Sequence, residues 1–246
     1  MRLFQAILAT LLFAASLHAA DGVAVLDSLA NAQATKGGES LAMGQAFEPT
    51  GLEINTEANG FAAIVFSNGV SLYLSPRTRL VVDEFQQTPF DSRPDDFDFE
   101  PSRSVLKISL LEGLIAVSQR DPNPISELTI KLKDGISTSI NARAAVVISQ
   151  SVEQEVAILD GRGSVSIHGE NQLLNQSYRL QAHVLEPGNR IRPITDALIQ
   201  EWQPLSDHAI TARRRWYFQT KDGAILPVRL LPTSVQSSKP FNSTKL

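Results

Sequence analysis

Side chains that could act as general acids, bases or nucleophiles are scarce in this sequence. It contains no cysteine, which rules out a thiol nucleophile. Beyond the N-terminal segment the histidines are His168, His183 and His208, and no two of them have the spacing of zinc ligands on one element. A nucleophile elbow, a phosphate-binding glycine loop and a dinucleotide-binding fingerprint are also missing. We therefore expect a protein that is not an enzyme, with no catalytic, cofactor-binding or metal-binding residues.

Two groups of carboxylates offer alternatives. Asp83 and Glu84 could serve as the acid and base of a carbohydrate-active enzyme, because glycosidases need two carboxyl groups at a set separation. A second group, at 95–100, lies within the stretch Gln86–Ser102, which is rich in proline and acidic residues. It lacks the glycine and the terminal glutamate of a calcium-binding loop, so the prediction there is a solvated acidic loop.

One basic and aromatic cluster could contact a partner. Arginine, tryptophan and tyrosine dominate binding hot spots. The candidate contact residues are consecutive in the sequence: Arg213, Arg214, Arg215, Trp216 and Tyr217. The alternative is an ordinary strand over 213–219, with Trp216 and Phe218 facing the core and Tyr217 facing water, which also fits the alternation.

The elements around these residues are predicted to be short β-strands separated by turns. Asn68-Gly69 lies between the apolar run 61–66 and the alternating run 70–74, and Asp134-Gly135 has the same role between 127–132 and 136–140. Further strands are expected at 80–85, 104–111, 114–118, 144–149, 155–159 and 164–167, with Gly113 and Gly161 between strands. This spacing is typical of an all-β sandwich, barrel or solenoid.

The two ends of the folded region are predicted to differ from its centre. Residues 23–43 could form a short strand or a loosely docked helix. Thr195 is a plausible cap for a helix of one or two turns ending near Trp202. A terminal hairpin is expected over 213–231, and a disordered tail from 232 onward.

The first residues predict export. Arg2 is followed by an apolar run, Leu3–Leu17, and by the small residues Ala19 and Ala20. This is the order of a secretory signal peptide, and we expect cleavage after Ala19 or Ala20 into the periplasm or the medium. An uncleaved anchor is the alternative, although the run is short for a bilayer span. No lipid-acceptor cysteine follows, and we expect no membrane span in the mature chain.

The overall charge argues against one class of partner. Lys and Arg number 22 and Asp and Glu 26, giving a net charge of −4. Since phosphate backbones are bound by concentrated positive charge, we do not expect nucleic acid as a partner.

The segment 51–85 resembles the FecR domain, a periplasmic β module. The resemblance lies in an extended start ending at Thr56, the Asn68-Gly69 turn between two strands, and Pro76 before the next strand. LLEGLIAVS at 110–118 and ILDGRGSVSI at 158–167 resemble the family's strand-Glu-Gly-strand step, and 180–191 resembles its closing strand. Where the family usually has Arg-Gly-Thr, this chain has Arg143-Ala144-Ala145, which leaves the local turn open.

The resemblance implies a twisted, solenoid-like or sandwich-like β domain outside the cytoplasm. Signalling members are anti-sigma regulators that span the inner membrane, but this chain lacks their cytoplasmic helical segment and internal span, so a soluble exported form is expected. The predicted organisation is a signal peptide (1–20), a lead-in (21–50), a FecR-like β domain (51–192), a short helix and hairpin (193–231) and a tail (232–246).

The leading hypothesis for function is a non-catalytic binding or scaffold module for a protein or an envelope polysaccharide. One alternative is a carbohydrate-active β-solenoid enzyme that uses Asp83 and Glu84. Another is a soluble relative of FecR-type regulators that docks to an outer-membrane transporter.

Overall fold

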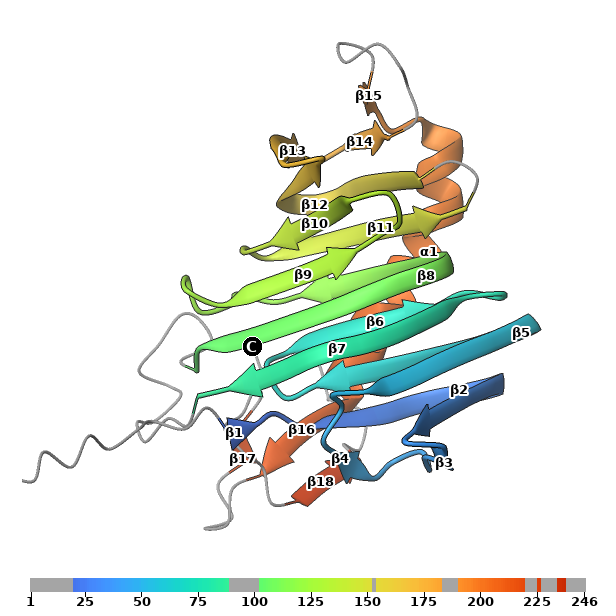
Figure 1. Ribbon diagram of the computed structural model, residues 1–246, viewed down its shortest axis with the longest axis vertical. Coiled ribbons are helices and arrows are strands. Elements are labelled where there is room, and N and C mark those ends of the chain that lie inside the picture. Colours follow the sequence, from blue (N-terminus) through green and yellow to red (C-terminus); the bar gives the residue numbers. More distant parts are fainter. Residues whose placement is uncertain are drawn as a thin grey trace, which may run out of the picture.

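The described part of the chain is built from β-strands and one helix, which confirms the all-β fold with a C-terminal helix (Figure 1). The structure is a computed structural model and describes residues 20–88, 102–151, 154–182, 190–219, 225–226 and 234–237. Residues 1–19 of the predicted signal peptide, the acidic stretch at 95–100 and His183 lie outside these ranges. Within them, no helix has both the length and the apolar character needed to cross a membrane.

Four long strands form the frame of the fold. They are β2 (Ala24–Lys36), β5 (Leu52–Phe66), β8 (Ser104–Gln119) and β12 (Gln154–Ile167). In β5, β8 and β12 the two halves pair with different neighbours, whereas β2 pairs with β5 along its whole length. The first half of β8 pairs with β7 (Arg79–Gln87), and its second half pairs with β6 (Val70–Leu74). The sequence left open whether residues 23–43 form a short strand or a helix. Most of them form the long strand β2.

These strands belong to one continuous 15-stranded sheet, which its bends fold into two facing layers, called here the first and the second sheet. The first sheet contains the β6 side of the long strands with β11 (Ala144–Gln150), β14 (Tyr178–Gln181) and β15 (Ile191–Pro193). The second sheet contains the β7 side with β9 (Glu127–Lys131), β10 (Ile136–Ile140) and β13 (Glu170–Asn175). The short strands β1 (Ala20–Asp21), β3 (Glu39–Ser40) and β4 (Ala46–Phe47) pair with β7 or β2 at one end.

Aliphatic side chains fill the space between the two sheets. They come from every long strand and include Leu26, Ile54, Ile64, Leu72, Leu106, Ile108, Val117 and Ile158, all fully buried. Phe66 and Phe85 meet edge to face with ring centroids 5.3 Å apart. The long strands bend from the first sheet into the second. The core between the sheets is therefore closed on both sides and resembles the interior of a barrel.

The bends in the long strands explain where the sequence interpretation differs from the structure. Gly113 and Gly161 were expected between separate strands, but each lies inside one continuous strand, β8 or β12. Both have positive φ, +93° and +80°, which L-residues rarely adopt. The strand changes sheets at this residue, so two short predicted strands are one long bent strand.

The hairpins predicted at Asn68-Gly69 and Asp134-Gly135 are both present, with different turn geometry. Asp134 and Gly135 have φ values of 56° and 70°, as in a type I′ turn, and connect β9 to β10. Between β5 and β6 only Gly69 has positive φ. The Asn68 side chain there accepts a hydrogen bond from Val70 N and donates one to Ser104 Oγ.

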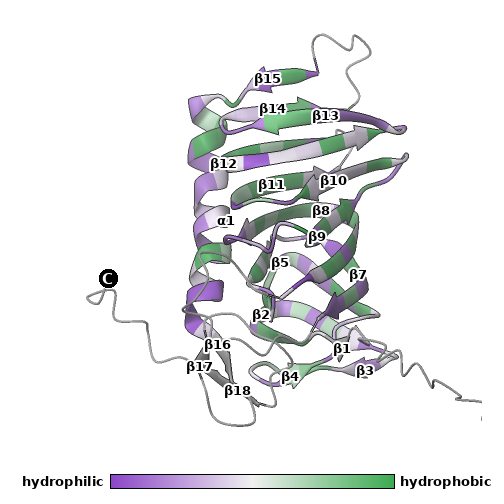
Figure 2. Cartoon of the chain, turned by 90° about the vertical axis from the view of Figure 1, so that its left-hand side faces the viewer, coloured by the Kyte–Doolittle hydropathy of each residue, from purple (hydrophilic) through white to green (hydrophobic). Residues whose placement is uncertain are grey.

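Helix α1 (Asp196–Arg215) covers the outer face of the first sheet and runs across its strands (Figure 2). Thr195 caps it, as predicted, by accepting a hydrogen bond from Leu198 N. Its buried stripe is Trp202, Ser206, Ala209 and Ala212, which packs on Ala116, Val147 and Ala157 and on Val25, Ala63 and Val65.

The predicted helix of one or two turns was too short, and the predicted strand over 213–215 was wrong. Pro204 follows Trp202 closely and normally ends a helix, because proline lacks the backbone N–H. Here the helix continues through Pro204, and small buried residues on the following turns let it approach the sheet closely. Arg213, Arg214 and Arg215 form its last turn.

A small separate sheet follows the helix. β16 (Trp216–Gln219) pairs with β17 (Ile225–Leu226), which confirms the terminal hairpin. On its other side β16 pairs with β18 (Ser234–Ser237). These four residues were predicted to belong to a disordered tail, and they instead form a strand because β16 offers an unpaired edge opposite β17.

Candidate partner-binding surface at the end of helix α1

A buried carboxylate fixes the basic and aromatic end of α1 on the β-sheet. Asp27 of β2 accepts a hydrogen bond from Trp216 Nε1 at 2.7 Å and another from Arg215 Nη1 at 2.9 Å. The Asp27 side chain is 3% exposed, whereas that of Arg215 is 54% exposed. Hydrogen bonds to an ionised group are stronger than neutral ones, so this contact holds Trp216 and the guanidinium of Arg215 in a defined orientation.

Arg213 lies two residues earlier and is turned toward the body of the protein. Its Nη1 atom is buried and has no hydrogen-bond partner among the described residues. Burial lowers the pKa of Arg213 to about 10, and the positive charges of Arg120, Arg214 and Arg143 act in the same direction. A buried cation that other cations surround is costly unless an anion compensates for it.

The strand register explains why arginines from distant parts of the sequence meet here. Gln119 at the end of β8 pairs with Ala144 at the start of β11, so Arg120 and Arg143 leave the ladder at the same edge. Arg120 lies 3.8 Å from Asp121, and Arg143 lies 4.0 Å from Asp160. We call Arg120, Arg143, Arg213 and Arg214 the basic cluster.

The structure brings together most of the predicted contact residues. Arg213 and Arg214 join the basic cluster, and Arg215 and Trp216 share Asp27. The side chain of Tyr217 lies outside the described part of the chain. Sequence reasoning missed Arg120 and Arg143, although Arg143 directly precedes a predicted strand and Arg120 lies two residues after another. Only the register between those strands shows that they are neighbours.

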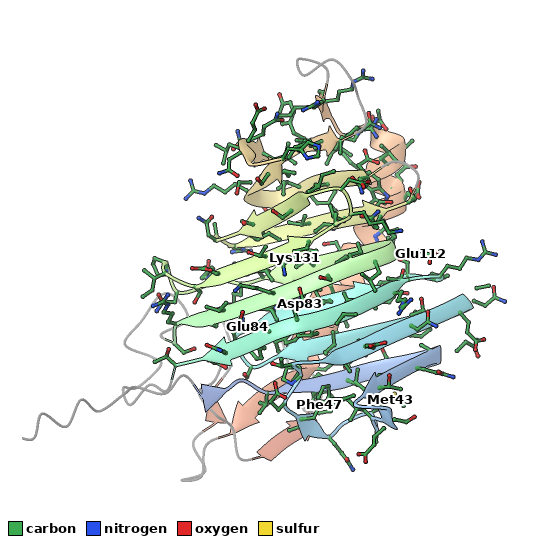
Figure 3. All side chains as sticks on the ribbon, in the orientation of Figure 1. Met43, Phe47, Asp83, Glu84, Glu112 and Lys131 are labelled. Atoms are coloured by element: carbon green, nitrogen blue, oxygen red, sulfur yellow. The ribbon has the colours of Figure 1, made fainter. Side chains whose placement is uncertain are left out.

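The candidate carboxylates Asp83 and Glu84 project from the outer face of the second sheet (Figure 3). A bulge in β7 opposite β8 places them there. Asp83 accepts hydrogen bonds from Ser109 Oγ at 2.9 Å and Lys131 Nζ at 3.0 Å, and Glu84 accepts one from Lys107 at 2.7 Å. The hydrogen bond to Glu84 raises the pKa of Lys107. Both carboxylates thus have cationic partners on a half-exposed surface.

The two described histidines lie apart. His168 is in the turn after β12, with φ of 50°. His208 of α1 stacks on Tyr73, with ring centroids 4.8 Å apart, and Phe61 stacks near the same Tyr73 ring at 6.0 Å. Burial raises the pKa of Tyr73. Across the described ranges, no group of three histidine, aspartate or glutamate side chains is placed to hold a metal ion.

Two solved structures resemble this fold. Both are crystal structures of a protein described as a "putative anti-sigma factor" from Parabacteroides distasonis ATCC 8503. One aligns with a TM-score of 0.45 at 11% identity and the other with 0.43 at 12%. Each alignment covers 61% of this chain, which spans 63% and 64% of the length of those chains. No protein-family model matches the sequence, and no curated protein does.

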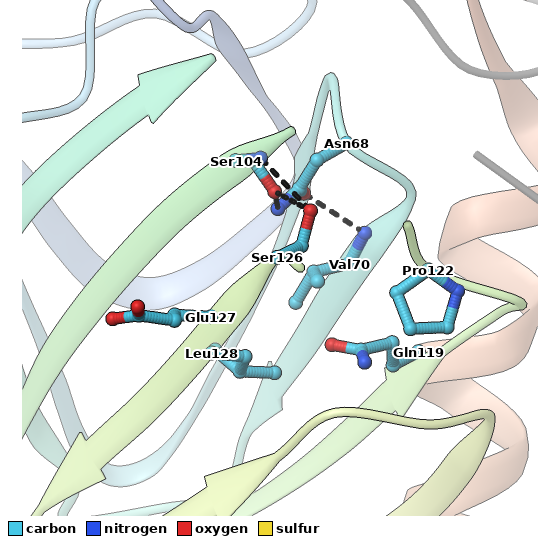
Figure 4. Close-up of a pocket in the computed structure, with 8 residues that line it drawn as sticks. All are labelled: Asn68, Val70, Ser104, Gln119, Pro122, Ser126, Glu127 and Leu128. Atoms are coloured by element: carbon cyan, nitrogen blue, oxygen red, sulfur yellow. Dashed lines mark hydrogen bonds between the residues drawn. The ribbon is translucent and has the colours of Figure 1, made fainter. Parts of the chain in front are cut away.

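Two hollows lie near the ends of β8 and β9. The first is a polar cavity of about 10 Å³, lined by Asn68, Ser104, Gln119 and Ser126 among others (Figure 4). Hydrogen bonds link Asn68 to Ser104 and Ser104 to Ser126, and the space suits a single water molecule. The second is a groove of about 530 Å³ along β9 and β10, with Arg103, Ile125 and Asn141 in its lining.

Proposed function

We propose that this chain is an exported, non-catalytic binding module whose partner is a protein, and that the end of α1 is its contact surface. The observation that carries the proposal is the fixation of Arg215 and Trp216 by the buried Asp27. Side chains that are ordered before binding lose less conformational entropy when a partner arrives. Arginine and tryptophan are also the residue types that contribute most to protein interfaces.

The proposal favours a protein over an envelope polysaccharide as the partner. The contact surface combines guanidinium groups with one half-buried indole, and Arg214 and Arg215 are exposed beside it. Guanidinium groups match carboxylates and backbone carbonyls, which proteins present in abundance. Recovery of an outer-membrane transporter as the partner would favour the related alternative of a regulator-like protein.

We also propose that the β domain is of the FecR type. The motifs that carry the resemblance fall at structural transitions: Asn68-Gly69 in the turn between β5 and β6, and Gly113 and Gly161 in the bends of β8 and β12. Ala144, at the position of the family's usual glycine, begins β11 and pairs with Gly161.

Site-specific photo-crosslinking tests the function. A photoreactive residue is placed at Arg214 on the contact surface, or at Arg79, an exposed arginine of β7, as the control. After incubation of the purified chain with envelope extract, we expect a discrete protein adduct from position 214 and none from position 79. Adducts from neither position, or equally from both, would count against the proposal.

A further inference from the structure

We propose that the basic cluster binds a carboxylate-bearing, acidic segment of the partner protein, with Arg213 as the residue that receives the carboxylate. This inference rests on the proposed function and specifies the chemistry of the partner. It starts from a positively charged side chain whose buried Nη1 atom has no hydrogen-bond acceptor in the described part of the molecule.

The charge of Arg213 is poorly compensated within the described residues. Its Nη1 is buried without a partner, and three other arginines act on it. The nearby carboxylates of Asp27 and Asp121 contact Arg215 and Arg120, and Asp160 contacts Arg143. Of these three, Asp121 favours the charge on Arg213, but its effect is smaller than that of each of the three arginines. An added anion would therefore relieve repulsion and supply the missing acceptor.

A carboxylate on a peptide fits this surface better than a small free anion. Two ion pairs of the cluster, Arg120 with Asp121 and Arg143 with Asp160, are arginine–aspartate pairs. The planar guanidinium matches a carboxylate in a bidentate geometry. Trp216 follows Arg213 by three residues, and its half-buried indole offers aromatic surface that only an extended ligand can use.

The uncompensated charge allows a binding role of Arg213 to be distinguished from a structural one, because its removal should affect stability and peptide binding differently. The pKa of Arg213 lies below its ordinary value of 12.5, so at neutral pH its positive charge opposes folding. Replacing it with methionine keeps most of the side-chain volume and removes the charge. We expect Arg213→Met to keep or raise the melting temperature while it weakens the binding of acidic peptides.

The experiment measures binding of a fluorescent aspartate-rich peptide to the purified chain by anisotropy. An asparagine-rich peptide of the same length is the ligand control, and inorganic phosphate is tested as a competitor. The variants are Arg213→Met, Arg213→Lys and, as a matched control on another face, Arg79→Met. We expect saturable binding of the aspartate-rich peptide only, weakened by salt. Binding should weaken about 10- to 100-fold in Arg213→Met, as for a lost charged hydrogen bond, and should change little in Arg79→Met.

Three outcomes would overturn the inference: equal binding of both peptides, unchanged binding by Arg213→Met, and binding of phosphate without binding of the acidic peptide. Loss of binding by Arg213→Met together with a lowered melting temperature would also overturn it, unless Arg213→Lys restores both. The photo-crosslinking experiment is independent of these results. A specific adduct at Arg214 with no acidic-peptide binding would reject this inference and leave the proposed function in place.

Discussion

Gly161 packs directly against the backbone of Arg143, so that a Cβ atom on the glycine would lie 2.0 Å from the Arg143 carbonyl oxygen. The contact joins the bend of β12 to the residue that precedes β11. Arg143 therefore has its place in the basic cluster because the strand beside it can approach without a side chain in between.

The first prediction concerns this close approach. Gly161→Ala should destabilise the fold by about 3 kcal/mol, because it combines an unfavourable positive φ with a clash against backbone. Gly51→Ala is the matched control, since Gly51 has the same φ of +80° and nothing within 4 Å of an added Cβ. It should cost only about 1–2 kcal/mol. Urea unfolding followed by circular dichroism measures both, and equal losses would refute the role of the contact.

The second prediction concerns Asp27. Asp27→Ala leaves Trp216 Nε1 and Arg215 without their shared acceptor, and should destabilise the protein by about 1–3 kcal/mol. It should also shift the tryptophan emission as Trp216 loses its fixed environment. Glu53→Ala, an exposed carboxylate change on β5, serves as the control and should leave both unfolding and emission nearly unchanged. An unaltered emission spectrum in Asp27→Ala would contradict the anchoring role.

The third prediction concerns the stack of Phe61, Tyr73 and His208. His208→Ala removes a ring 4.8 Å from Tyr73 and should cost about 0.5–1.5 kcal/mol. A double-mutant cycle with Tyr73→Leu isolates the pair, and we expect a coupling energy of similar size. Additive effects of the two substitutions would show that the rings do not interact.

The fourth prediction concerns pH. Burial by itself raises the pKa of Glu48, but hydrogen bonds from Lys36 and Thr50 outweigh it and leave the pKa below the ordinary 4.5. A lowered carboxyl pKa stabilises the folded state above 4.5, and this contribution is lost as the pH falls through the folded-state value. Glu48→Gln should therefore lower the urea midpoint at neutral pH and make its decline on acidification shallower. Parallel pH profiles for both proteins would contradict this.

The fifth prediction tests the enzymatic alternative. Because Asp83 and Glu84 are engaged by Lys131 and Lys107, we expect no polysaccharide hydrolysis by the purified chain. The measurement is release of reducing sugar from a panel of envelope polysaccharides, with Asp83→Asn beside the unmodified chain. Hydrolysis that disappears in Asp83→Asn would establish the enzyme and reject the binding module.

Local patterns in the sequence predicted the strands well where the signal is local. Alternation identified β6 and β9, and Asp134-Gly135 gave the correct turn, because turn chemistry depends on adjacent residues alone. The long strands were divided wrongly at Gly113 and Gly161. A glycine with positive φ serves equally well in a turn and in a bend, and only the partner strands on either side decide between them.

The candidate surface shows the same division. The consecutive residues Arg213 to Trp216 were recognisable as a group, but their secondary structure was not, because tertiary packing of Ala209 and Ala212 carries the helix past Pro204. Arg120 and Arg143 could not be assigned to the surface from sequence. Their proximity depends on a strand pairing between distant segments.

The course of α1 has a mechanical consequence. A sheet in which each strand contacts only its neighbours could unfold from either end, one strand at a time. Since α1 contacts β2, β5, β6, β8 and β11, it connects strands that are not all neighbours in the sheet. Unfolding of the strands at one end of the sheet must therefore also detach α1. We expect the domain to unfold in a single cooperative step. Force applied by a partner bound to the last turn of α1 would be distributed over all of these strands.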